Sequence, residues 1–113
     1  MKVADGYIED IARLFDIPKA PANLLKLLVY KAFQGHIRLS EFDRIELCDE
    51  LNINRQTLAN YTNILSKAGI LKRLARNQYQ LNPMLFSQNR KIIFNRIVID
   101  YIDGERVISG SSS

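Results

Sequence analysis

The order of helix, turn and strand signals between residues 39 and 83 constrains the fold of this 113-residue chain most. Ser40 is a good N-cap residue, with Asp43 three positions later in a capping-box arrangement. Asn52 accepts a left-handed backbone, and Gly69 suits the residue after a helix end. The predicted elements are, in order, a helix over 40–51, a tight connection over 51–54, a helix over 55–68, and strands over 70–74 and 78–81 around the turn Ala75-Arg76-Asn77. This order predicts a mainly α fold with a small β hairpin, an α+β class.

The flanking segments extend this unit. Apolar spacing predicts a helix over residues 6–16, then a central helix with Pro21 in its first turn and Gly35 at its end, then a short strand over 36–39. We expect one domain over 1–108, with its core over about 21–83 and a flexible tail over 109–113. Segment 90–108 suits a hairpin turning at Asp103-Gly104, although a helix over 92–102 stays open. The natural protein can continue beyond Ser113 into a further domain.

Composition narrows the class of protein. Hydrophobic residues make up 47% and charged residues 25%, which is typical of a globular domain. The single Cys48 excludes an internal disulfide, and the single His36 excludes a paired-His metal motif. No apolar run reaches the roughly 18 residues of a membrane span, and no signal peptide is evident. We therefore expect a soluble, cytoplasmic protein in a reducing setting, with no cofactor and no membrane partner.

Charge is distributed unevenly along the chain. The formal net charge is +4, yet the stretch from Leu51 to Ile99 contains eight Lys or Arg residues and no Asp or Glu. Ordinary solvated surfaces mix charges of both signs. A basic segment without acids suits a polyanion, because each Lys or Arg that neutralises a phosphate releases a counterion.

The predicted helix over 55–68 has two opposite faces. On a helical wheel, Leu58 and Leu65 lie opposite a narrow polar row, and that row consists of Gln56, Asn60, Asn63 and Lys67. Amide side chains can pair with the N6 and N7 atoms of adenine, and lysine can reach guanine or a phosphate. The row therefore suits a DNA major groove, provided that it faces outward.

At these residues the sequence resembles a winged helix-turn-helix DNA-binding domain. Leu47 to Leu58 (LCDELNINRQTL) resembles the helix-turn-helix signature of bacterial regulators and replication proteins, with Cys48 where Ala is usual and Asn52 where Gly is usual. Ile64 to Leu71 (ILSKAGIL) resembles the join between recognition helix and wing. The resemblance covers roughly residues 39–83 and implies operator binding, usually as a homodimer.

A narrower resemblance concerns Tyr79 to Phe86 (YQLNPMLF), which is similar to the run after the wing in certain plasmid replication initiators. That family binds origin DNA to start replication. The sequence-based hypothesis is therefore a sequence-specific double-stranded DNA-binding protein, most simply a replication initiator domain of a plasmid or mobile element. The expected DNA-binding residues are Arg55, Gln56, Thr57, Asn60, Asn63, Lys67, Lys72, Arg73, Arg76, Asn77 and Gln78.

The sequence agrees less well with other functions. The acidic side of the helix over 40–51 suits a solvated face better than a metal cluster. Catalysis is not expected, because His36 has no partner for a nicking site and Cys48 lies on an apolar face. A winged-helix transcriptional repressor and a protein-interaction module remain alternatives, since a fold does not settle a function. RNA binding is a minor possibility, because no strand carries a recognisable aromatic pair.

Overall fold

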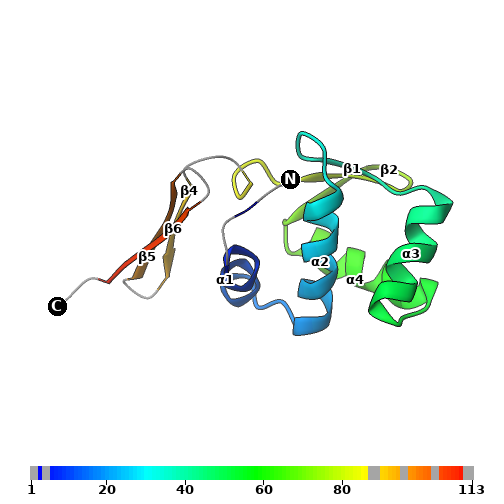
Figure 1. The fold of residues 1–113 in the computed structure, drawn as a ribbon, viewed down its shortest axis with the longest axis horizontal. Helices are drawn as coiled ribbons and strands as arrows, with labels where there is room; N and C mark the ends of the chain where they lie inside the picture. The colour runs from blue at the N-terminus through cyan, green and yellow to red at the C-terminus, as the bar shows by residue number, and fades with distance from the viewer. Residues whose placement is uncertain (1–2, 4–5, 87–89, 95–96, 103–104, 111–113) are drawn as a thin grey trace.

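The computed structural model describes residues 3, 6–86, 90–94, 97–102 and 105–110. These residues form four helices and two three-stranded antiparallel sheets, so the fold is α+β. Figure 1 shows α2 between α1 and α3, with the first sheet lying across one end of the helices.

The first two helices are shorter than the sequence predicts. Helix α1 spans Tyr7–Leu14, and α2 spans Lys19–Lys31 with Pro21 in its first turn. The expectation that Gly35 ends the second helix is wrong, because the backbone of Ala32 is already extended, with φ −67° and ψ 138°. Gly35, with φ 79°, instead belongs to the turn that leads into the first strand.

Helix α3 spans Glu41–Leu51 and begins with the predicted capping box. The backbone N–H of Asp43 donates to Ser40 Oγ over 3.1 Å, and the backbone N–H of Ser40 donates to Asp43 Oδ2 over 2.9 Å. The helix ends at Asn52, whose φ of 54° and ψ of 49° confirm the predicted left-handed conformation. A side-chain cap at the start and a left-handed residue at the end thus define both ends of α3 from local sequence.

Helix α4 spans Arg55–Lys67 and ends in a Schellman motif. The backbone N–H of Gly69 donates to the carbonyl of Ser66, and that of Ile70 donates to the carbonyl of Leu65, both over 3.1 Å. This arrangement needs a positive φ at Gly69, which is 81°, so the predicted role of Gly69 is confirmed.

The first sheet has the strand order β1-β3-β2. Its strands are β1 (His36–Arg38), β2 (Leu71–Ala75) and β3 (Gln78–Leu81). The β2–β3 hairpin therefore turns at Arg76 and Asn77 alone, while Ala75, predicted as part of the turn, belongs to β2. At the open end of the hairpin, the Asn82 side chain donates to the Gly69 carbonyl over 2.9 Å.

The core lies between α2, α4 and the inner face of this sheet. Its fully buried side chains include Ile11, Leu24, Leu25, Leu28, Leu47, Leu65, Ile70 and Leu81. Because α4 contributes Leu58 and Leu65 to this core, its opposite side faces solvent.

The second sheet contains β4 (Arg90–Phe94), β5 (Ile97–Ile102) and β6 (Glu105–Gly110) in that order. The sequence left a hairpin and a helix open for this segment, and the structure has the hairpin, with β5 paired antiparallel with β6. Strand β4 adds a third strand by pairing with β5. Ser109 and Gly110, expected in the tail, belong to β6. The predicted turn at Asp103-Gly104 and the end of the tail at 111–113 lie outside the described residues.

Candidate nucleic-acid interface

The polar row of α4 is exposed along its length. Gln56, Asn60, Asn63 and Lys67 are all exposed, while Leu58, Thr62 and Leu65 on the other side are buried. Gln56 Nε2 donates to Asn60 Oδ1 over 3.2 Å. Each amide keeps unused hydrogen-bonding capacity, since an amide group has two N–H donors and an oxygen with two lone pairs.

The first turn of α4 is held by local contacts. The Asn54 side chain caps the helix and accepts a hydrogen bond of 2.8 Å from the backbone N–H of Thr57. Thr57 itself is half-buried. Arg55 is exposed and forms an ion pair with Glu41 at the start of α3. This predicted DNA-binding arginine is thus already paired with a carboxylate in the free protein.

The β2–β3 hairpin presents two chemically different faces. Arg73 lies opposite Tyr79, and both line the hollow between the hairpin and α4. Lys72 lies opposite Gln80, and because successive side chains of a strand alternate, it points to the other face. Gln78 lines a separate hollow on that other face. The structure therefore does not bring Lys72 and Gln78 onto the surface that carries Arg73 and Arg76.

The tip of the hairpin is fixed to the rest of the sheet. Asn77 has a φ of 60°, a left-handed conformation that asparagine tolerates, and its carbonyl accepts a 2.9 Å hydrogen bond from the backbone N–H of Leu39. This bond holds the turn beside the end of β1, while the Arg76 side chain stays exposed.

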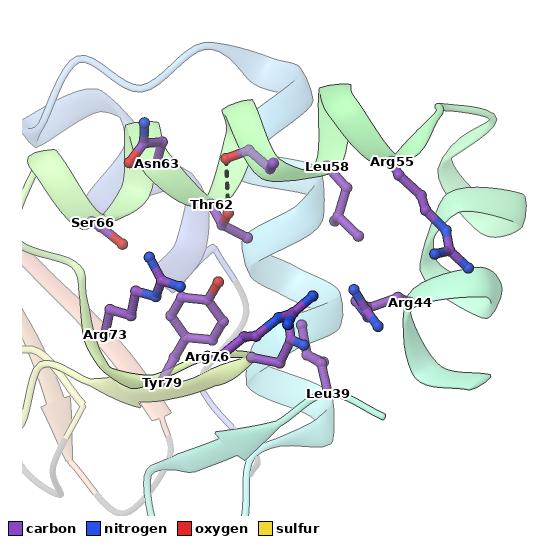
Figure 2. A pocket seen from close by; sticks show the side chains of 12 residues that line it. Leu39, Arg44, Arg55, Leu58, Thr62, Asn63, Ser66, Arg73, Arg76 and Tyr79 are labelled. Atoms are coloured by element: carbon purple, nitrogen blue, oxygen red, sulfur yellow. Dashed lines mark hydrogen bonds between the residues drawn. The ribbon is translucent and has the colours of Figure 1, made fainter. Parts of the chain in front are cut away.

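An open groove runs between α4 and the hairpin, as Figure 2 shows. Its volume is about 320 Å³. Arginine dominates its charge, and no Asp or Glu stands among the described residues that line it. The lining residues are Leu39, Arg44, Arg55, Leu58, Ala59, Thr62, Asn63, Ser66, Arg73, Arg76, Asn77 and Tyr79.

Five of the predicted residues meet in this groove: Arg55, Asn63, Arg73, Arg76 and Asn77. Gln56, Asn60 and Lys67 lie on the exposed side of α4, outside the groove lining. The groove thus joins the outward row of α4 to the inner face of the hairpin, and Asn63 belongs to both surfaces.

The sequence-based prediction missed Arg44 and Tyr79. Arg44 belongs to α3, whose other charged residues are all acidic. The sequence therefore predicted an acidic surface for this helix, and Arg44 was not included in the site. A wheel of α3 places Arg44 on the side of Leu47 and Leu51, away from most of the carboxylates. This wheel position could have identified Arg44 as a site residue, because it directs a basic side chain toward the neighbouring elements and not toward solvent.

Ion pairs on the far side of α3 are separate from the groove. Lys31 Nζ donates to Glu46 Oε1 over 2.8 Å, and this hydrogen bond is the main reason that the pKa of Lys31 is raised. The backbone N–H and then the hydroxyl of Ser40 lower the pKa of Asp43. The contacts of Lys31 with Asp43 and Glu46 join α2 to α3, and they neutralise carboxylates that would otherwise repel a polyanion.

The described residues show neither a metal-binding cluster nor a membrane-spanning helix. Over the described parts of the chain, no group of three or more His, Cys, Asp or Glu side chains is arranged to hold a metal ion. None of the described helices is both long enough and apolar enough to span a bilayer. Cys48 is half-buried against the core, and His36 is exposed at the start of β1.

Together, the described residues define an α+β protein with four helices, two small antiparallel sheets and an arginine-lined groove between α4 and a β hairpin. The chain belongs to the family described as Domain of unknown function (DUF8612), whose model matches residues 2–95. Comparison with curated proteins and with solved structures gave no match. Since the family description names no function, a functional conclusion depends on the chemistry of the site.

Proposed function

We propose that this chain is a winged-helix protein that binds double-stranded DNA in a sequence-specific manner and catalyses no reaction. The observation that carries the proposal is the exposure of the whole amide and lysine row of α4 beside an arginine-lined groove. Two Asn, one Gln and one Lys in a single row free of acids form a surface that can pair with base edges and does not repel phosphates. In this proposal α4 is the recognition helix and the β2–β3 hairpin is the wing.

In the proposed complex, α4 enters the major groove, which is wide enough to admit a helix. Gln56, Asn60 and Asn63 contact base edges, and Lys67 contacts guanine or a phosphate. Arg73 and Arg76 line the protein groove between α4 and the hairpin. They therefore contact phosphates of the DNA strand that lies along this protein groove. Base contacts then supply specificity, while the arginines supply most of the salt-dependent affinity.

Origin binding in plasmid or mobile-element replication is the narrower form of the proposal. It rests on the similarity of Tyr79 to Phe86 to the segment after the wing in certain replication initiators. Within this segment Tyr79 lines the arginine groove, and Asn82 ties the hairpin to the end of α4. Binding as a homodimer, to an origin or to an operator, belongs to the same proposal.

A salt titration tests DNA binding directly. The affinity for a mixed-sequence duplex, measured by fluorescence anisotropy, should fall as salt is added. A plot of log affinity against log salt concentration should have a slope of about −0.9 per phosphate contact. Four contacts would weaken binding roughly 100-fold between about 50 and 200 mM salt. Absence of binding at the lower salt concentration would reject the proposal in favour of a protein-interaction module.

Selection of bound fragments from a random duplex pool then separates the roles. A palindromic site would favour operator binding by a two-fold dimer, whereas tandem direct repeats would favour an origin. Recovery of no consensus, despite salt-dependent binding, would contradict sequence-specific readout by the α4 row.

A further inference from the structure

One carboxylate bridges two arginines at the end of the groove. Glu41, the first residue of α3, accepts a hydrogen bond from Nη2 of Arg44 through one oxygen and from Nη2 of Arg55 through the other. Arg55 is the first residue of α4, so this bridge joins the starts of both helices. Glu41 itself is not among the described residues that line the groove, whereas both arginines are.

Arg44 has hydrogen-bonding capacity that the bridge leaves unused. Its side chain is only 24% exposed, and its Nε is buried without a partner among the described residues. Buried donors are nearly always paired in folded proteins, and Arg44 lines an open groove, so its unpaired Nε indicates a guanidinium that the free protein does not fully satisfy. In Figure 2 the guanidinium of Arg44 lies beside that of Arg55, and Arg76 reaches toward them from the hairpin.

The charge at this end of the groove is not balanced. Arg44, Arg55 and Arg76 contribute three positive charges, and among the described residues Glu41 is the one carboxylate that forms an ion pair with any of them. A carboxylate and a phosphate both offer paired oxygens to the forked donors of a guanidinium. Glu41 is 55% exposed and Arg55 is 57% exposed, and ion pairs at such exposure are weak. An incoming anion can therefore replace Glu41 without a large loss.

We propose that Arg44 and Arg55 form a binding site for one phosphate of the DNA backbone, which the carboxylate of Glu41 occupies until a phosphate displaces it. This inference rests on the proposed DNA-binding function. It adds Arg44, on α3, to the contacts and makes Glu41 a competitor that lowers affinity for DNA. The site accepts any phosphodiester of suitable position, so it acts equally on specific and non-specific duplex.

The test compares E41Q with E50Q. Both variants remove one negative charge from α3, but Glu50 is exposed near the far end of the helix and forms no ion pair with any described residue. E41Q should bind duplex DNA about fivefold more tightly than the natural protein, the effect of one unit charge at about 4 Å in water. E50Q should change affinity by less than about twofold, because Glu50 lies about 14 Å along α3 from Glu41, beyond the roughly 10 Å over which salt screens exposed charges at about 0.1 M.

A double substitution completes the test. In an R44A background, E41Q should gain less than about twofold, because one of the two donors that receive the phosphate is gone. Circular dichroism and thermal melting establish that each variant is folded. If the natural protein binds DNA but E41Q binds no more tightly than E50Q, the phosphate site is refuted while the proposed function stands. If neither the natural protein nor any of its four variants binds duplex at low salt, the proposed function itself fails.

Discussion

Replacing Arg73 by alanine should weaken DNA binding, whereas the same change at its neighbour Lys72 should have little effect. Both substitutions remove one positive charge from β2. Arg73 lies opposite Tyr79 and lines the groove, while Lys72 lies opposite Gln80 on the other face of the hairpin. The comparison therefore separates the position of a charge from its mere presence.

The magnitude follows from counterion release. One phosphate contact contributes a slope of about −0.9 to the dependence of log affinity on log salt. At about 0.1 M salt, losing that contact lowers affinity about eightfold, or about 1.2 kcal/mol. Lys72 acts only through its long-range electrostatic field, which salt screens over about 10 Å at this concentration. The affinities of R73A and K72A should therefore differ by nearly the whole of this roughly eightfold factor.

The assay is fluorescence anisotropy of both variants on the same duplex over a range of salt concentrations. R73A should reduce the salt slope by about 0.9, and K72A should reduce it by less than about 0.3. Thermal melting of each variant controls for loss of fold. Equal losses for R73A and K72A, or a larger loss for K72A, would show that the groove face of the hairpin is not the face that meets DNA.

Two further predictions concern base readout and acid stability. N60A should cost about 1–3 kcal/mol on a selected site and relax the preference for the contacted base, measured by competition; an equal loss on unrelated duplex would assign Asn60 to non-specific binding instead. The Ser40 backbone N–H and hydroxyl lower the pKa of Asp43, so its stabilising effect is complete above the ordinary Asp pKa of about 3.9 and is lost as pH falls through and below that value. The melting temperature of the natural protein should therefore exceed that of D43N at pH 7, and the difference should shrink as pH falls through and below the ordinary Asp pKa; a difference that is independent of pH would contradict this account.

The helices and hairpin of the first 86 residues were predictable because their signals are local. Ser40 with Asp43, Asn52 and Gly69 each fix a helix end through the backbone conformation or hydrogen bonds of nearby residues. The predicted end of α2 at Gly35 is wrong, because the backbone leaves the helical conformation at Ala32. Phe33 then pairs with His36, and Gly35 lies in the turn between them. That pairing helps to bring β1 beside β3, a contact between residues far apart in sequence.

Within the candidate site, periodicity alone determined the outward row of α4. Leu58 and Leu65 must be buried for the helix to pack, so Gln56, Asn60, Asn63 and Lys67 must face solvent. Alternation along β2 likewise separates Lys72 from Arg73, although the sequence-based prediction grouped them by their shared charge.

Tertiary structure decided which residues share the groove. A helical pattern states which side of α3 carries Arg44, but only the packing of α3 against α4 sets Arg44 and Glu41 beside Arg55. The pairing of β2 with β3 and the placement of the hairpin against α4 add Arg73 and Tyr79. Local sequence fixes the direction of a side chain relative to its own element, whereas long-range burial of the core fixes what lies opposite it.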